Sequence, residues 1–143
     1  MPRPPSRQQL ATSVWTTMQD LVLSQDRTRE LRDALGLGRG SGRVKLLLSL
    51  ADGPLSLGDL SEITGVDAPY ATLIVNELEA RGLVTRTPAA DDRRRKLVSL
   101  TRSGQDAVST AHGIINRPPT SFEQLSTGQL RQLSAVLSEL DET

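Results

Sequence analysis

The sequence predicts a mainly α-helical protein with one small β-hairpin, and three observations lead to this fold class. Apolar residues recur at three- and four-residue spacing through most of the chain, as amphipathic helices require. Two short helical patterns, joined by a glycine-containing turn, occupy residues 56–81. Two strand-like segments with a basic loop between them follow directly. Together these features predict an α+β winged helix-turn-helix, flanked by long terminal helices.

The N-terminal third is expected to hold a tail and two helices. Residues 1–6 contain three prolines and no apolar anchor, so they are predicted to be a disordered tail. The apolar pattern of residues 7–35 predicts one long helix with a bend near 24–26. Four glycines among residues 36–43 end this helix and predict a flexible connection. A further helix is expected over residues 44–51.

Capping residues predict where the central and C-terminal helices begin. Ser56 is placed to cap a short helix, and Asp67 to cap the next helix, which has Pro69 in its first turn and runs to residue 81. Strands are expected at 83–86 and 96–100. Thr101 then caps a helix over 102–116, and Ser126 opens the last helix.

The composition predicts a single domain that associates with a second copy. Aromatic residues make up only 2% of the 143 residues, so one subunit has few of the side chains that bury most area. We expect one domain over residues 7–143, with a winged helix at about 44–101 and long helical regions at about 7–35 and 102–143. No apolar run is long enough to span a membrane, and the expected location is cytoplasmic.

Charge is strongly polarised along a chain whose formal net charge is zero. Residues 81–102 contain seven basic and only two acidic residues, whereas the rest of the chain carries ten basic and fifteen acidic ones. A globally basic nucleic-acid binder is therefore excluded, and any affinity for double-stranded DNA must come from this local cluster.

Two stretches of this region, LEARGLVTR and ADDRRRKLVSLTRSG, together with the order of the helices, are similar to the MarR (multiple antibiotic resistance regulator) family. The resemblance extends over nearly the whole chain from about Gln8. It implies a homodimeric, sequence-specific DNA-binding transcription regulator, a repressor on a palindromic operator, with dimerisation helices at about 7–35 and 102–143. It also implies a small, often aromatic, anionic effector that binds between the dimer interface and the DNA-binding lobe and releases the DNA.

The helix after Asp67 is the expected recognition helix. Its apolar stripe should face the core, which leaves a set of candidate DNA contacts toward the groove: Pro69, Tyr70, Thr72, Leu73 and Asn76. The alternative for Tyr70, Leu73 and Thr72 is a packing or merely helix-compatible role. Relatives often carry a basic residue where this chain has Leu73 or Glu77, so the wing is expected to supply more of the affinity. A glutamate can accept a hydrogen bond from a cytosine amino group but repels phosphate.

The wing motif Asp-x-Arg of the family falls on Asp92 and Arg94. Arg94 is expected to enter a narrow minor groove, with Asp92 orienting its guanidinium by a fork-like pair. Arg93 and Arg95 should contact phosphates, and Arg86 is expected to add a backbone contact from the base of the strand. The alternative is an ordinary solvated loop.

The alternatives to a DNA-binding regulator are a protein-interaction module and an enzyme. A winged helix can serve as a protein-interaction module without specific DNA binding, and Leu73 and Glu77 favour this alternative. An enzyme is not expected, since no nucleophile–base pair or phosphate-binding loop is visible. With one histidine, His112, and no cysteine, we predict no metal site and no cofactor. His112 and Trp15 could contact an effector, although surface or interface packing is the preferred interpretation.

Overall fold

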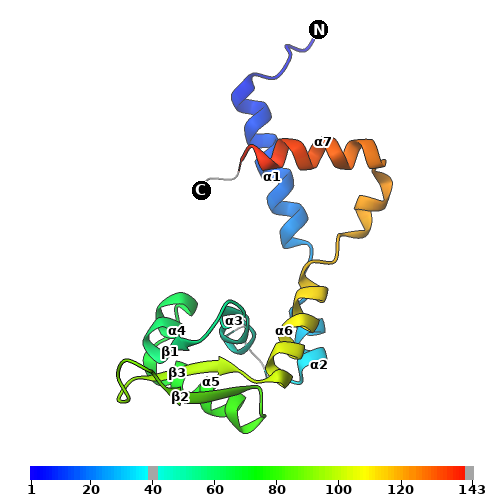
Figure 1. Ribbon diagram of the computed structural model, residues 1–143. Coiled ribbons are helices and arrows are strands. Elements are labelled where there is room, and N and C mark those ends of the chain that lie inside the picture. Colours follow the sequence, from blue (N-terminus) through cyan, green and yellow to red (C-terminus); the bar gives the residue numbers. More distant parts are fainter. Residues whose placement is uncertain (39–41, 141–143) are drawn as a thin grey trace.

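The computed structural model describes residues 1–38 and 42–140, which form a winged-helix lobe and a separate pair of helices (Figure 1). In chain order the elements are α1 (Arg7–Leu23), α2 (Thr28–Leu35), α3 (Gly42–Ser49), β1 (Leu55–Ser56), α4 (Leu57–Thr64), α5 (Ala68–Ala80), β2 (Val84–Pro88), β3 (Lys96–Leu100), α6 (Arg102–Ile115), a 3₁₀ turn (Thr120–Gln124) and α7 (Thr127–Ser138). The mainly helical fold class with a small wing is confirmed. Residues 39–41 of the glycine-rich connection lie outside the described residues, so its expected flexibility stays a prediction.

Side-chain caps fix most helix starts where the sequence predicted them. The side chains of Ser56, Asp67, Thr101 and Ser126 each accept a hydrogen bond from the backbone N–H three residues later. These bonds satisfy N–H groups that have no partner inside the helix. Residues 1–6 contain no helix or strand, and Ser6 caps α1.

The predicted single helix over residues 7–35 is wrong, because the chain is interrupted between α1 and α2. Three polar side chains in the segment between α1 and α2 form hydrogen bonds with backbone groups. The Ser24 hydroxyl donates to the Leu21 carbonyl, and an Asp26 carboxylate oxygen accepts from the Thr28 N–H. Arg27 donates to the carbonyl oxygens of Ile114 and Ile115 at the end of α6. Short polar side chains of this kind compete with the helical hydrogen bonds, so the expected bend is a break.

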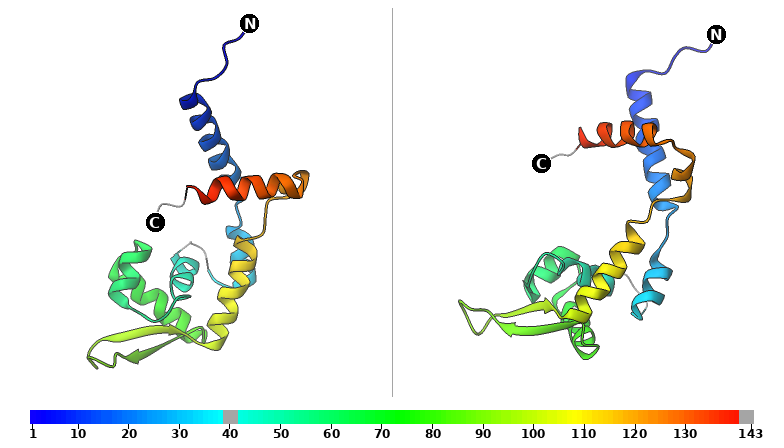
Figure 2. Two further views of the ribbon diagram at one scale, coloured as in Figure 1. Left: turned by 45° about the horizontal axis from the view of Figure 1, so that its top comes forward. Right: turned by 45° about the vertical axis from the view of Figure 1, so that its right-hand side comes forward.

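The winged-helix lobe contains the hydrophobic core. Its buried side chains come from α3, α4, α5, β2, β3 and α6 and include Leu46, Leu60, Ile74, Leu78 and Val98. The sheet has the order β1-β3-β2, with both pairs antiparallel. The two-residue strand β1, which pairs Leu55 with Val98, is too short to leave a periodic signal in the sequence. This sheet positions the β2–β3 loop, which projects away from the helices (Figure 2).

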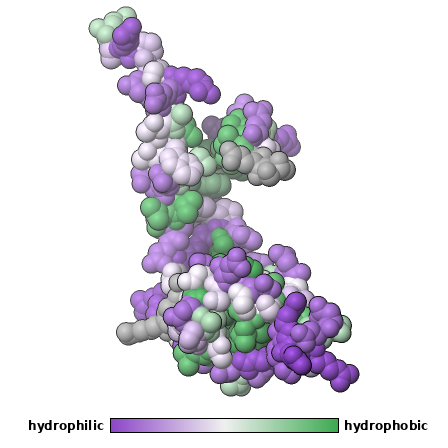
Figure 3. Space-filling view, turned by 90° about the vertical axis from the view of Figure 1, so that its left-hand side faces the viewer, coloured by the Kyte–Doolittle hydropathy of each residue, from purple (hydrophilic) through white to green (hydrophobic). Residues whose placement is uncertain are grey.

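The helices at the two ends of the chain lack a core of their own. Neither α1 nor α7 contains a buried residue, although α7 crosses α1 in each ribbon view (Figures 1 and 2). Hydrophobic side chains lie on the surface of this part of the molecule (Figure 3). Helices α2 and α6 pack against each other and join this region to the winged-helix lobe. In the described chain no helix combines the length and hydropathy needed to cross a membrane.

Gly104 in the first turn of α6 allows the wing to approach this helix. A Cβ atom at this position would collide with the backbone carbonyl oxygen of Leu83, which also accepts the Thr101 N–H at 3.0 Å. We expect Gly104→Ala to destabilise the protein by about 1–3 kcal/mol, because the collision involves backbone that cannot rotate away.

Gly113, near the other end of α6, is the matched control. A Cβ atom there meets nothing within 4 Å, so Gly113→Ala should stabilise the helix by up to about 1 kcal/mol. Urea unfolding of both variants measures the difference. Equal midpoints for the two variants would contradict the close approach of Leu83 to α6.

Candidate nucleic-acid interface

Helix α5 buries one face and presents the other to solvent. Ala71, Ile74, Val75 and Leu78 are buried, as the sequence pattern predicted. At 3.6 residues per turn, the stripe opposite this face is formed by Pro69, Leu73, Asn76 and Ala80, and all four are exposed. This exposed stripe lies on the second helix of the helix-turn-helix, which is the helix that enters the major groove in DNA-binding proteins of this kind.

The candidate DNA contacts on α5 differ in their existing contacts within the protein and in their exposure to solvent. The Thr72 hydroxyl donates to the Ala68 carbonyl at 3.0 Å, so only its acceptor capacity is left for a ligand. Tyr70 is partly exposed and lies close to Gly42, where an added Cβ would meet the tyrosine ring at 3.4 Å. Leu73 is 49% exposed on the outer stripe. Leu73 is therefore accessible to a ligand, whereas Tyr70 is partly held by packing.

Arg43 is a residue beside this surface that the sequence analysis did not single out. Its guanidinium makes two hydrogen bonds to the Glu77 carboxylate, at 2.6 and 3.0 Å. These hydrogen bonds lower the pKa of the Glu77 carboxyl below its usual range and raise the pKa of Arg43. Glu77 is therefore ionised at neutral pH, but a fork-like partner compensates its charge. The repulsion that Glu77 was expected to exert on phosphate is correspondingly reduced.

Arg86 reaches from β2 onto α5 instead of toward solvent. One guanidinium nitrogen donates to the Asn76 Oδ1 at 2.6 Å, and another donates to the Glu79 carboxylate at 3.2 Å. The side chain is only 22% exposed, and its Nε is buried without a hydrogen-bond partner. In this conformation Arg86 links the wing to the recognition helix, which differs from the free phosphate-binding cation that the sequence suggested.

The tip of the wing is an ordered turn that carries exposed cations. Ala89 is buried, and its N–H donates to the Arg95 carbonyl at 2.8 Å, which closes the loop. Arg93, Arg94 and Arg95 are all exposed. Within residues 1–38 and 42–140, no carboxylate forms an ion pair with any of these three guanidinium groups.

The expected fork between the Asp92 carboxylate and the Arg94 guanidinium is not formed. An Asp92 carboxylate oxygen instead accepts the backbone N–H of Arg94 at 3.0 Å, and the Asp92 carbonyl accepts the Arg95 N–H at 3.1 Å. A carboxylate that is two residues before its donor readily closes such a local turn. Asp92 therefore shapes the backbone of the tip and leaves the Arg94 side chain in solvent.

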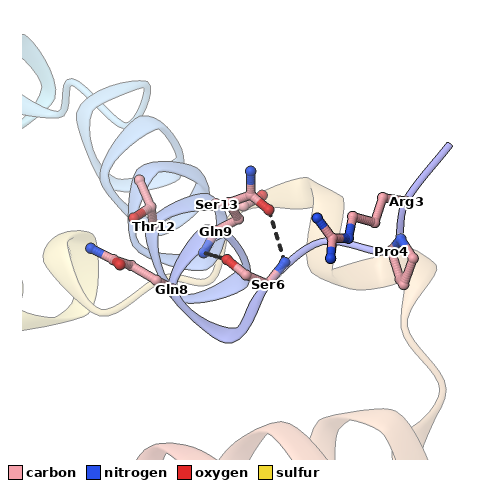
Figure 4. Close-up of a pocket in the computed structure, with 7 residues that line it drawn as sticks. All are labelled: Arg3, Pro4, Ser6, Gln8, Gln9, Thr12 and Ser13. Atoms are coloured by element: carbon pink, nitrogen blue, oxygen red, sulfur yellow. Dashed lines mark hydrogen bonds between the residues drawn. The ribbon is translucent and has the colours of Figure 1, made fainter.

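The other candidate residues lie away from this surface. His112 is exposed on α6, and Trp15 is 60% exposed on α1. In the part of the chain that the structure describes, no three His, Cys, Asp or Glu side chains cluster as metal ligands would. An open hollow lies where the N-terminal tail meets α1 (Figure 4). The reciprocal hydrogen bonds of Ser6 and Gln9 in this hollow form the capping box of α1, which is a structural feature of the helix.

A helix-turn-helix followed by a basic, solvent-exposed hairpin defines a winged-helix protein of the DNA-binding class. A family model described as "MarR family" matches residues 35–95, a range that spans α3 to the tip of the wing. Over these residues, which make up less than half of the chain, the protein is similar to the MarR family.

Solved structures of similar fold cover nearly the whole chain. The transcriptional regulator Tm0710 from Thermotoga maritima is 27% identical over 92% of each chain, with a TM-score of 0.73. RV1404 from Mycobacterium tuberculosis is 21% identical, with a TM-score of 0.71, over 98% of this chain and 95% of its own. The reduced form of MarR from E. coli is 21% identical, with a TM-score of 0.65, over 89% of this chain and 95% of its own. The last two likenesses concern the fold alone.

Proposed function

We propose that the protein is a homodimeric repressor that binds a palindromic double-stranded DNA operator through α5 and the wing. The observation that carries this proposal is the exposed trio of Arg93, Arg94 and Arg95, which form no ion pair with any residue that the structure describes and lie on a hairpin next to α5. In this arrangement α5 enters the major groove, while Arg94 reaches the adjacent minor groove. Arg93 and Arg95 contact phosphates on either side.

The terminal helices supply the dimer interface. Leu10, Val14 and Trp15 on α1 are between 51% and 60% exposed. On α7, exposed Leu130, Leu133 and Leu137 line one hollow together with Phe122. An isolated helix as short as α7 is marginal in water without tertiary packing, so a second copy that covers these faces stabilises both helices. This assigns residues 44–101 to DNA binding and residues 7–35 and 102–143 to dimerisation.

The symmetry of the dimer determines the symmetry and the half-site spacing of the operator. Two recognition helices related by a two-fold axis bind half-sites about 10 base pairs apart, and the operator is palindromic. The dimer as a whole makes about six to eight phosphate contacts. Repression follows when the occupied operator overlaps a promoter.

Binding to genomic DNA tests this proposal. The purified protein is incubated with sheared genomic fragments of its source, and the retained fragments are sequenced and measured by mobility shift at several salt concentrations. We expect a palindromic motif and affinity that falls steeply with salt. Absence of salt-sensitive binding to any fragment contradicts the proposal and favours the protein-interaction module instead.

A pocket between the two parts of the subunit supports the effector that the family resemblance implies. Its volume is about 380 Å³, and it is lined by Leu31, Val44, Leu48 and Ile115, with Arg32 and Lys45 at its side. The Arg32 Nε is buried without a hydrogen-bond partner, which suits an anionic group on an apolar ligand.

Benzoate added to the protein–DNA complex should release the DNA from wild type but not from Arg32→Met. If benzoate released the DNA equally from both proteins, Arg32 would not be part of the effector site.

Glu77 offers a test of charge at the DNA-facing surface. We expect Glu77→Gln to strengthen DNA binding several-fold at low salt, because the substitution removes a negative charge and leaves the Arg43 cation unneutralised. The salt slope should become steeper by about one for each phosphate that Arg43 then contacts. Fluorescence anisotropy with a labelled operator measures both quantities.

The opposite substitution in the same pair provides the control. Arg43→Gln removes the cation that is hydrogen-bonded to the Glu77 carboxylate and should weaken binding. If Glu77→Gln weakened binding as well, Glu77 would be a direct DNA contact that accepts a hydrogen bond from a cytosine amino group.

A further inference from the structure

The wing is a two-stranded hairpin along most of its length. Strand β1 pairs only with Val98 and Leu97 of β3, whereas β2 and β3 continue as a pair to Pro88 and Lys96. A two-stranded hairpin without further packing is marginally stable in water. The position of the wing tip relative to α5 therefore depends on contacts at the base of the hairpin.

Arg86 makes such a contact from the middle of β2. It lies two residues after the buried Val84, and therefore on the same side of the strand. One terminal nitrogen of its guanidinium donates to the Asn76 Oδ1 at 2.6 Å, and the other donates to the Glu79 carboxylate at 3.2 Å. Asn76 and Glu79 are neighbours on the surface of α5, because they are three residues apart on one helix. The two bonds thus fasten β2 to α5 at two points.

Between Arg86 and the tip, the hairpin forms no hydrogen bond or ion pair with a helix in the described part of the chain. At about 3.3 Å per residue, the stretch from Arg86 to Asp91 extends over about 16 Å. A rotation of the hairpin by about 15° at its base would move the tip by about 4 Å, which exceeds the rise of one base pair, about 3.4 Å. A contact by Arg94 at one base step therefore requires that the base of the hairpin is held in place.

We propose that Arg86 is the positioning residue of the wing. Through its two bonds to α5 it sets the distance between the base pairs that α5 contacts and the minor-groove step that Arg94 enters. Arg86 itself does not touch the DNA, which distinguishes this role from the phosphate contact that the sequence suggested. The inference rests on the proposed function, because it requires α5 and Arg94 to lie in adjacent grooves of one duplex.

A double-mutant cycle between Arg86→Met and Arg94→Ala tests this inference by fluorescence anisotropy with the selected operator. Arg86→Met alone should weaken binding about tenfold, and Arg94→Ala should then cost about tenfold in this background instead of about a hundredfold. The double variant should therefore bind about as weakly as Arg94→Ala, with the same salt slope. A phosphate contact by Arg86 predicts the contrary, because the two losses would then multiply and the slope would become shallower by about two more. That outcome overturns the inference.

Two further variants separate positioning from charge. Arg86→Lys keeps the positive charge but loses the planar fork that reaches both acceptors, so it should show the same loss as Arg86→Met. Glu79→Met removes one of the two bonds together with a negative charge near the DNA. It should weaken binding, whereas an effect of charge alone would strengthen it. Wild-type affinity in Arg86→Lys, or tighter binding by Glu79→Met, contradicts the positioning role.

The outcomes separate the inference from the proposed function. If wild type binds DNA with a steep salt dependence but the losses multiply in the cycle, the inference fails while DNA binding stands. It also fails if Arg94→Ala binds as wild type does, because there is then no contact to position. Absence of salt-sensitive binding by wild type overturns the proposed function and the inference together. If Arg86→Met does not fold, as judged by its thermal unfolding, the cycle between Glu79→Met and Arg94→Ala decides the question, since the Glu79 side chain is 42% exposed.

Discussion

Arg94→Ala is expected to weaken operator binding about a hundredfold at low salt, because the proposed dimer loses the two cations that we assign to the minor groove. The Arg94 side chain is exposed and forms no ion pair among the described residues, so its removal leaves no buried group unsatisfied. The fold should therefore keep its thermal midpoint. The slope of log affinity against log salt should become shallower by about two, one for each wing.

A cation elsewhere on the subunit provides the control for this prediction. Arg29 is exposed on α2, and Arg29→Ala removes the same charge without altering the wing. We expect it to change affinity only slightly, through the general field of the protein. Equal losses in the two variants would show that the wing acts only through net charge, which contradicts a specific contact by Arg94.

Leu133→Asp is expected to abolish high-affinity operator binding by separating the subunits. Leu133 lines the hollow on α7, where the partner covers it in the proposed dimer. A carboxylate buried there would be desolvated without a partner. A single subunit engages one half-site only, so operator affinity should fall by about 10²–10⁴-fold as the advantage of two linked sites is lost. Light scattering should report a monomer, and circular dichroism should report lost helix.

The same charge on the other side of α7 is the control. Gln132 lies on the face of this helix opposite the leucine stripe, so Gln132→Asp should remain dimeric and bind the operator as wild type does. A Leu133→Asp protein that stays dimeric with unchanged affinity would place the interface elsewhere. The assignment of residues 102–143 to dimerisation would then be wrong.

The elements of the fold could be predicted because their signals are local. A capping side chain acts on a backbone N–H three residues away, and the buried face of α5 follows from helical periodicity. For this reason the starts of α4, α5 and α6 agree with prediction. The break at residues 24–27 was only partly visible, since its hydrogen bonds include Arg27 contacts to carbonyls 87 and 88 residues away.

Side-chain partners at the interface could not be predicted, because they join residues that periodicity does not relate. Arg43 and Glu77 are 34 residues apart, and the pairing of Arg86 with Asn76 depends on how β2 lies against α5. The exposed arginines of the wing are a different case. They form no ion pair within the described part of the chain because they lie at the tip of a hairpin, which the polar loop and the flanking strands had already indicated.

The central claim is that the wings of the two subunits contact the phosphates of one DNA duplex. The salt dependence of wild-type affinity for its selected operator is the most direct test of this claim. Anisotropy titrations between low and physiological salt should give a slope of about −5 to −7 for log affinity against log salt. A slope near zero, or one that Arg94→Ala leaves unchanged, would mean that the arginines of the wing serve some other partner.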